Sequence, residues 1–191
     1  MSRQIILAST SPRRLLLFKL LGIKFLAVDS GFKEVVDSKL SHEDLVKFLA
    51  LGKARAAAKK YPKAVIVAAD TMVSFGGKII GKPKNKRDAE QMLKSFSGNA
   101  QDVITGVAVL DSQTKQVIIT SDKIKVYFKK LSVQDISAYI KTGEPFDKAG
   151  GYGPQGPGFN LIDKIDGDFT NILGLPMTIV LNALEKLGVK V

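Results

Sequence analysis

Two carboxylates lie at positions where a folded chain can bring them together with several cations. Asp70 directly follows the apolar run 64–69, at the carboxyl end of an expected central strand, and Glu34 lies in a polar loop after an earlier strand. Ligand sites of open α/β sheets lie at the carboxyl ends of strands. Mg²⁺ prefers oxygen ligands and is commonly held by one or two carboxylates plus substrate oxygens. The pair therefore indicates a magnesium-bridged phosphate site.

A second cluster occupies the segment 9–14, Ser-Thr-Ser-Pro-Arg-Arg, where a strand is expected to end and a helix to begin. Backbone N–H groups, hydroxyls and the guanidiniums of Arg13 and Arg14 would meet there at the positive end of a helix dipole. Arginine suits phosphate because its planar fork makes two contacts and keeps its charge. We expect an anion site, with an ordinary capped helix and two exposed arginines as the alternative.

Lys53 lies four residues after Leu49 and eight after Leu45, close to the stripe that the helix buries. Its stem could pass along the apolar face to water. Alternatively, its ammonium points into a cleft that holds an anion. A third interpretation makes Lys53 and Asp70 a structural ion pair with no catalytic role.

The composition is that of one globular domain over residues 1–191, with 45% hydrophobic and 25% charged residues. Thiol nucleophiles and zinc–thiolate sites are excluded because the chain has no cysteine. No apolar run approaches the ~20 residues of a membrane span. The first ten residues also lack the features of a secretory signal. We therefore expect no membrane association and a cytoplasmic location.

The net charge of +11 favours an anionic partner. Nucleic acid is one such partner, and a nucleic-acid-binding or regulatory protein is the alternative function. The lysines are scattered, however, and no aromatic stacking motif accompanies them, so we regard nucleic acid as the weaker choice. The sequence also has no P-loop and no strand-linked Gly-x-Gly-x-x-Gly, which leaves phosphate chemistry based on a metal, carboxylates and water.

The order of expected elements predicts an α/β fold in which helices flank a twisted, mixed central sheet. Helices are expected at 12–21, 42–61, 87–96, 133–141 and 175–187. Strands are expected at 5–8, 25–28, 64–69, 72–75, 78–80, 103–110, 117–128 and 159–165. Glycines 76 and 77 join two of these strands in a hairpin.

Taken in order, the motifs resemble those of the Maf family of nucleoside-triphosphate pyrophosphatases. They extend through nearly the whole chain, so a chance match is improbable. The matching pieces are Ala8-Ser9-Thr10-Ser11-Pro12-Arg13-Arg14, Glu34, Lys53-Ala54, Ala69-Asp70-Thr71, Gly81-Lys82-Pro83, Ser97-Gly98, Thr105-Gly106-Val107, Thr142-Gly143-Glu144-Pro145, Asp147-Lys148-Ala149-Gly150, Tyr152-Gly153, Gln155-Gly156, Gly167-Asp168, Asn171 and Gly174-Leu175-Pro176.

The resemblance implies hydrolysis of a nucleoside triphosphate to the monophosphate and pyrophosphate, by a homodimer with a fold shared with inosine-triphosphate pyrophosphatases. It also implies roles for matching residues. Glu34 and Asp70 would bind a divalent cation, Mg²⁺ or Mn²⁺, and orient or deprotonate the attacking water. Lys53 and Lys82 would balance charge on the phosphates. The phosphate chain would be held by Ser9, Arg13 and Arg14, and the base would be recognised by Gln155.

Within the family, Pro12 followed directly by Arg13, together with Lys82 and Gln155, resembles the branch that acts on dTTP, UTP and modified pyrimidine nucleotides. The branch that prefers methylated guanosine triphosphate usually carries a tryptophan after that proline. This chain contains no tryptophan. The resemblance therefore implies pyrimidine nucleotides as substrates.

Overall fold

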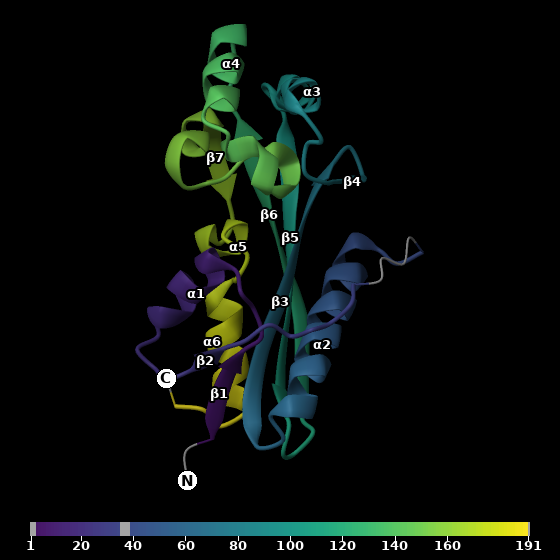
Figure 1. Ribbon diagram of the computed structural model, residues 1–191, viewed down its shortest axis with the longest axis vertical. Coiled ribbons are helices and arrows are strands. Elements are labelled where there is room, and N and C mark those ends of the chain that lie inside the picture. The colour runs from purple at the N-terminus through teal and green to yellow at the C-terminus, as the bar shows by residue number, and fades with distance from the viewer. Residues whose placement is uncertain (1–2, 35–38, 191) are drawn as a thin grey trace. The chain divides into compact units, whose positions relative to one another are not determined.

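A computed structural model describes residues 3–34 and 39–190 (Figure 1). The chain forms two compact units, which are described separately. The first comprises Met1–Thr71, Ile104–Asp122 and Phe169–Val191, and the second comprises Met72–Val103 and Lys123–Asp168. Three long strands contribute residues to both units. The expectation of one domain over residues 1–191 stays a prediction.

The strands form a mixed sheet with the order β2-β1-β3-β5-β6-β7, and β4 pairs with β3. β1 runs parallel to β2 and β3, whereas the β3–β4 and β6–β7 pairs are antiparallel. This arrangement confirms the predicted fold class. The strands are β1 Gln4–Leu7, β2 Leu26–Ala27, β3 Ala64–Phe75, β4 Lys78–Ile80, β5 Ala100–Asp111, β6 Val117–Phe128 and β7 Ile162–Asp166.

In the first unit, α2 (His42–Lys60) lies on one side of β1 and β3, and α6 (Met177–Lys186) lies on the other (Figure 1). The unit also contains α1 (Pro12–Lys19) and α5 (Phe169–Ile172). The Ser41 side chain accepts a hydrogen bond from the Asp44 N–H and so caps α2. Lysines in the last turn of α2 lie at the negative end of the helix dipole and stabilise the helix there.

Small residues let α2 pack closely on the sheet. Ala50, Ala54 and Ala57 are buried against apolar residues of β1, β3 and β5. At Gly106 of β5, a Cβ atom would lie 2.4 Å from the backbone carbonyl carbon and oxygen of Val46 in α2. A side chain at that position would push the helix away. The glycine therefore sets the depth at which α2, and Lys53 with it, is seated.

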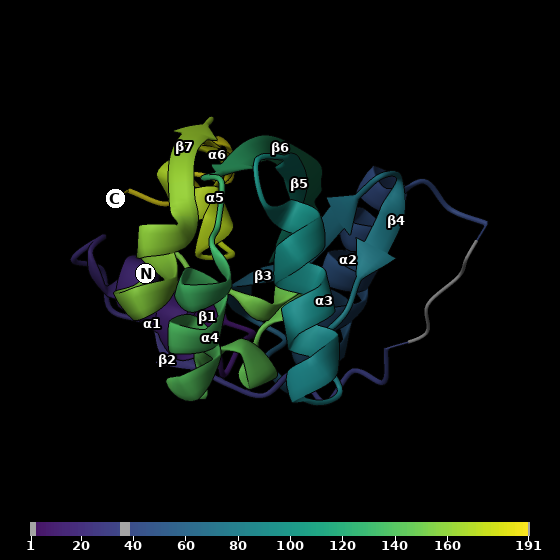
Figure 2. The same ribbon diagram turned by 90° about the horizontal axis from the view of Figure 1, so that it is seen from above.

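The second unit contains α3 (Lys86–Phe96), α4 (Val133–Lys141) and three 3₁₀ turns, which are Glu144–Asp147, Ala149–Gly151 and Gly156–Leu161. Figure 2 shows α3 beside α4. Ser132 and Asp135 form a reciprocal capping box at the start of α4. Phe96, Phe128 and Tyr152 pack their rings together, and these contacts join the 3₁₀ region to α3 and the sheet.

Several predicted boundaries differ from those of the structure, and two of the differences change the element to which a segment belongs. Residues 159–161 of the expected strand 159–165 belong to a 3₁₀ turn, because the turn begun by Gly156 and Pro157 continues to Leu161. The apolar run 64–69 was expected to end at Asp70, but β3 continues to Phe75. The segment 72–75, expected as a separate strand, is the end of β3.

Among the described residues, no helix is both long and apolar enough to cross a membrane.

Candidate active site

The turn from β1 into α1 presents unpaired polar groups. The pairing of β1 with β3 ends at Leu7 and Val67, and the chain then turns through Ser9, which is buried. The N-cap of α1, Ser11, makes no side-chain cap hydrogen bond. The Nε atom of Arg13 is buried and has no hydrogen-bond partner among the residues that the structure describes. A buried donor of this kind needs an acceptor, so the turn has the character of an anion site.

Arg14, the next residue, is held by the protein itself. Its Nε donates to the Gly174 carbonyl (2.7 Å), Nη1 to the Ala69 carbonyl (2.8 Å) and Nη2 to Thr71 Oγ1 (2.9 Å). Burial lowers the pKa of Arg14, and the nearby charge of Asp70 acts in the opposite direction. All three nitrogens of the guanidinium therefore donate hydrogen bonds to other groups of the folded chain. This favours a supporting role for Arg14 over the phosphate contact that the resemblance implied.

From Arg14, a series of hydrogen bonds continues through Thr71 into the first unit. The hydroxyls of Thr71 and Thr105 lie 3.0 Å apart, and Thr105 Oγ1 donates to the Asn171 carbonyl (3.4 Å). The fully buried Asn171 donates from Nδ2 to Asp122 Oδ2 (2.6 Å). The motif list included three of these residues without assigning them a role. Their spacing carries no signal of the network, which forms only when β3, β5, β6 and α5 assemble.

Lys53 joins the two predicted carboxylates. Its Nζ lies 2.5 Å from Asp70 Oδ1 and 2.7 Å from Glu34 Oε1. The side chains of Lys53 and Asp70 are 14% and 11% exposed, whereas that of Glu34 is 51% exposed. Of the two alternatives for Lys53, the structure does not show the one in which the ammonium passes to bulk water, because the ammonium pairs with both carboxylates. An ion pair is present, so the catalytic and structural interpretations of Lys53 and Asp70 both stay open to test.

Burial governs the acidity of Asp70. Its pKa is raised by loss of hydration, and the charges of Lys53 and Arg14 oppose that shift in part. A carboxylate with a raised pKa is a better proton acceptor than a free one near neutral pH. Such shifts also occur in structural ion-pair networks. The chemistry of Asp70 therefore fits a general base.

The position of Asp70 within β3 explains why the site forms there. Because β1 ends at Leu7, the edge of β3 beyond Val67 lacks that neighbour, and the Ala69 carbonyl accepts from Arg14 instead. The carboxyl end of β1, rather than that of β3, therefore locates the site. The rule that ligands lie beyond strand ends holds for the shorter strand.

The two carboxylates also suit a divalent cation. Glu34 and Asp70 converge on one ammonium, so their oxygens already meet at a site of positive charge. No group of three or more metal-binding side chains occurs among residues 3–34 and 39–190. Two carboxylates with the remaining positions open match Mg²⁺, which keeps waters and takes substrate oxygens. The donor set therefore fits such a cation.

Lys82 and Gln155 belong to the second unit. Lys82 is exposed after β4, and Gln155 is exposed before the third 3₁₀ turn. Glu144 organises the loop of Gln155, because its Oε2 accepts from the Gly158 N–H (3.3 Å) and its Oε1 lies 3.8 Å from the Lys148 ammonium. The resemblance matched Glu144 and Lys148 but assigned them no role. The roles given to Lys82 and Gln155 stay predictions.

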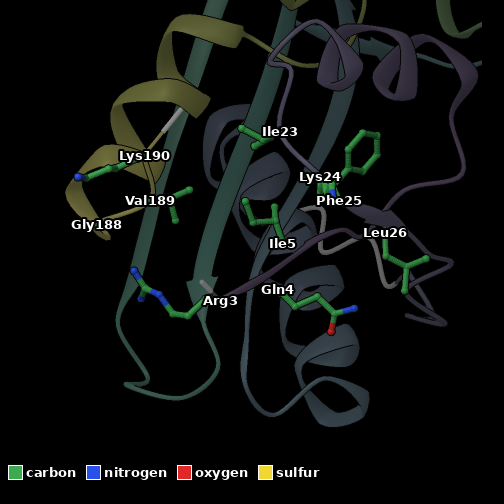
Figure 3. A pocket seen from close by; sticks show the side chains of 10 residues that line it. All are labelled: Arg3, Gln4, Ile5, Ile23, Lys24, Phe25, Leu26, Gly188, Val189 and Lys190. Atoms are coloured by element: carbon green, nitrogen blue, oxygen red, sulfur yellow. The ribbon is translucent and has the colours of Figure 1, made fainter. Parts of the chain in front are cut away.

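A cavity of about 700 Å³ lies at the other end of β1 (Figure 3). It is lined by the start of β1, the segment leading into β2 and the residues after α6. None of the residues with predicted roles lines it. Arg3 beside it donates to Asp111 and to the Leu187 carbonyl, which ties the two ends of the described chain to β5. This cavity is separate from the candidate site.

Comparison with known proteins identifies the family. Residues 4–187 match the model of the family described as Maf-like protein. The chain belongs to the Maf-like family. It is 44% identical over 190 residues to a dTTP/UTP pyrophosphatase of Methanosarcina mazei, covering 99% of this chain and 96% of the relative. It is 42% identical over 190 residues to a dTTP/UTP pyrophosphatase of Caldicellulosiruptor saccharolyticus, covering 97% and 96%.

Solved structures give weaker similarities. The Ham1 protein of Staphylococcus aureus aligns with a TM-score of 0.48 and 16% identity over 84% of this chain and 80% of its own. A HAM1 protein from Coxiella burnetii aligns with a TM-score of 0.49 and 14% identity over 85% and 81%. The Maf-like family resemblance inferred from the motifs is confirmed by the family match, and the predicted activity agrees with the names of the curated relatives.

Proposed function

We propose that this Maf-like protein hydrolyses nucleoside triphosphates to the monophosphate and pyrophosphate, with dTTP, UTP and modified pyrimidine nucleotides as substrates. The names of the relatives support the reaction and the substrates. The observation that carries the proposal is that Lys53 holds Glu34 and Asp70 together. Arg14 also lies near enough to Asp70 and Glu34 for their charges to oppose the lowering of its pKa.

The β1–α1 turn is proposed to bind the phosphate chain. Arg13 has a buried donor without a partner in the described part of the chain, and the start of α1 contributes the positive end of its dipole. Ser9 lies in the same turn, and its hydroxyl already accepts from the Ser11 N–H (3.2 Å). Charge that develops on the leaving phosphates would be stabilised by Arg13, Lys53 and the backbone N–H groups.

Asp70 is proposed to activate water. The water oxygen forms a bond to the α-phosphorus while the bond from that phosphorus to the oxygen bridging to the β-phosphate breaks. The bridging oxygen keeps the electron pair and leaves as part of pyrophosphate. Asp70 accepts the proton from water, for which its raised pKa is suited.

Glu34 and Asp70 would also hold the divalent cation, Mg²⁺ or Mn²⁺. When bound, the cation supplies positive charge to the phosphate oxygens and makes water more acidic. The ammonium of Lys53 keeps the carboxylates close together in its absence. The predicted homodimer and cytoplasmic location stay predictions.

A release assay tests the reaction. With dTTP or UTP and Mg²⁺ or Mn²⁺, pyrophosphate is expected as the first product, and excess chelator is expected to abolish turnover because charge on the phosphates is no longer balanced. Pyrophosphate and orthophosphate are measured separately, with a panel of purine nucleotides as the control. Orthophosphate appearing first would show cleavage at the γ-phosphate and contradict the proposal.

The pH profile provides a second test. Protonated Asp70 cannot accept a proton, so kcat is expected to fall as the pH drops through the pKa of Asp70. In the protein without a cation, burial raises that pKa above the value of a free aspartate, about 3.9, and the charge of a bound cation would act in the opposite direction. Lys53→Met removes a charge that favours the ionised carboxylate, so the limb should move to still higher pH. An acid limb that Lys53→Met leaves in place would remove Asp70 as its source.

A further inference from the structure

The ring of Phe32 lies directly against α2 at Gly52. A Cβ atom at Gly52 would be 2.3 Å from Phe32 Cζ, 2.6 Å from Cε2 and 2.8 Å from Cε1. Cβ atoms in proteins do not approach carbon atoms so closely, because the repulsion is too strong. The two residues therefore fit together only while position 52 has no side chain.

Gly52 has no other evident reason to be glycine. It lies in the interior of α2, where the backbone is helical and any residue except proline can adopt the conformation. Glycine is unfavourable in a helix interior because it loses more conformational freedom on folding than alanine does. The close approach of the Phe32 ring is what the missing side chain allows.

The contact joins the two segments that carry the ion pair. Phe32 precedes Glu34 by two residues, and Gly52 directly precedes Lys53. Lys53 is anchored because α2 is packed on the sheet, whereas Glu34 lies on a loop and is half exposed. The ring thus holds the loop to the helix within one or two residues of the Lys53–Glu34 contact.

Hydrogen bonds within the loop before Phe32 fix the backbone that carries the ring. Asp29 Oδ1 accepts from the Gly31 N–H (2.9 Å), and Ser30 Oγ accepts from the Phe32 N–H (3.2 Å). Gly31 has a φ of 67°, a left-handed conformation that glycine adopts without strain. Beside the ring, a cavity of about 250 Å³ is lined largely by apolar atoms of α2, including Phe48. A displaced ring therefore has space to move into.

We propose that the Phe32–Gly52 contact is the positioning device that keeps the Glu34 carboxylate at Lys53. Phe32 and Gly52 are positioning residues, since they act only through Glu34. The proposal rests on the proposed function, in which Glu34 helps to bind the cation. It adds that this function depends on Gly52, a residue with no side chain that could take part in the reaction.

Gly52→Ala tests the contact by adding one methyl group. The new Cβ should displace the ring, and in a crystal structure without nucleotide the distance from Lys53 Nζ to Glu34 Oε1 should exceed the ion-pair limit of about 4 Å. Activity with dTTP should fall at least ~10-fold, because the displaced Glu34 no longer helps to place charge at the phosphates. An unchanged ion pair in that crystal structure would overturn the proposal whether or not the chain hydrolyses dTTP.

Two backgrounds provide matched controls. In Phe32→Ala, which has no ring to displace, adding Gly52→Ala should change activity less than ~2-fold. In Glu34→Gln, adding Gly52→Ala should also have no further effect, since the residue through which the contact acts has lost its charge. A full loss from Gly52→Ala in the Glu34→Gln background would show that the helix itself is damaged and would contradict the positioning role.

Phe32→Leu serves as a variant that creates no clash. It shortens the side chain and weakens the contact, so it should lower activity in the same direction as Gly52→Ala but by less. Thermal unfolding should show that this variant stays folded. The absence of any loss in folded Phe32→Leu and Phe32→Ala would contradict the proposal. If the wild-type chain releases no pyrophosphate, the proposed function fails, and the crystal structure of Gly52→Ala still tests the contact.

Discussion

Replacing Asp70 with asparagine is expected to lower kcat at least ~10²-fold, because the amide cannot accept the proton of the attacking water. Asparagine keeps the shape of the side chain, so the loss should lie in turnover rather than in folding. The measurement is steady-state release of pyrophosphate from dTTP by purified protein. Near-normal turnover would leave Lys53 and Asp70 as a structural ion pair.

The same variant should not be less stable than the wild-type protein. The pKa of Asp70 is raised in the folded state by burial, so the folded protein binds its proton more tightly than the unfolded chain does. The ionised carboxylate therefore lowers the free energy of unfolding at neutral pH. That free energy should rise as the pH falls through the folded-state pKa, and this contribution should be absent from Asp70→Asn.

Urea unfolding at several pH values checks this stability effect. Asp70→Asn should have an equal or higher free energy of unfolding at pH 7 than the wild-type protein, with Lys53 still paired to Glu34. Asp135→Asn is a suitable comparison, because hydrogen bonds from Ser132 lower the pKa of that carboxyl group. The contribution of Asp135 to the free energy of unfolding should be lost as the pH falls, which is the opposite of the contribution of Asp70. A marked loss of stability in Asp70→Asn would show that the ion pair outweighs the burial of charge.

Alanine substitutions of the two neighbouring arginines are expected to have different effects on stability and activity. Arg14→Ala removes three hydrogen bonds from a buried cation and leaves the Ala69 and Gly174 carbonyls without those donors. A loss of about 3–5 kcal/mol in the free energy of unfolding should follow, with a fall in Tm of about 10 °C. Arg14→Lys should recover little of this, because an ammonium cannot reproduce the planar fork.

Arg13→Ala should have the opposite profile. Its Nε has no partner to lose within residues 3–34 and 39–190, so the free energy of unfolding should change by less than about 1 kcal/mol. Activity should fall ~10²-fold, since a donor to the phosphates is removed. Thermal unfolding and pyrophosphate release on the two alanine variants measure both effects. Equal stability in both variants would contradict the assignment of Arg14 to the fold.

Local patterns predicted the elements well where one physical rule decides them. The capped helix at 133–141 and the strand at 117–128 were predicted with the boundaries that the structure has. Capping by Ser132 and alternating burial both act over a few residues. The 3₁₀ turn that displaces the start of β7, and the short α5, were not predicted, because neither has enough residues for a periodic pattern.

The site was predicted in part for a related reason. Asp70 and Lys53 could be named because charged residues are unusual beside apolar runs, and Glu34 was named as a carboxylate of a polar loop that also matches a motif of the family. What Arg14 does could not be predicted, because two adjacent arginines look alike in a sequence. Their difference arises from the carbonyls of Ala69 and Gly174, which are distant along the chain. The Phe32–Gly52 contact likewise depends on a pair of residues with no motif.

That contact constrains the order in which substitutions can accumulate during evolution. A side chain at position 52 is acceptable only after position 32 has become smaller, since the reverse order passes through a clash. The two positions should therefore vary together among descendants of this sequence. A lineage that lost the ring first could then accept a charged side chain at position 52, next to Lys53. Such a side chain would change the electrostatics of the site without altering any residue that touches substrate.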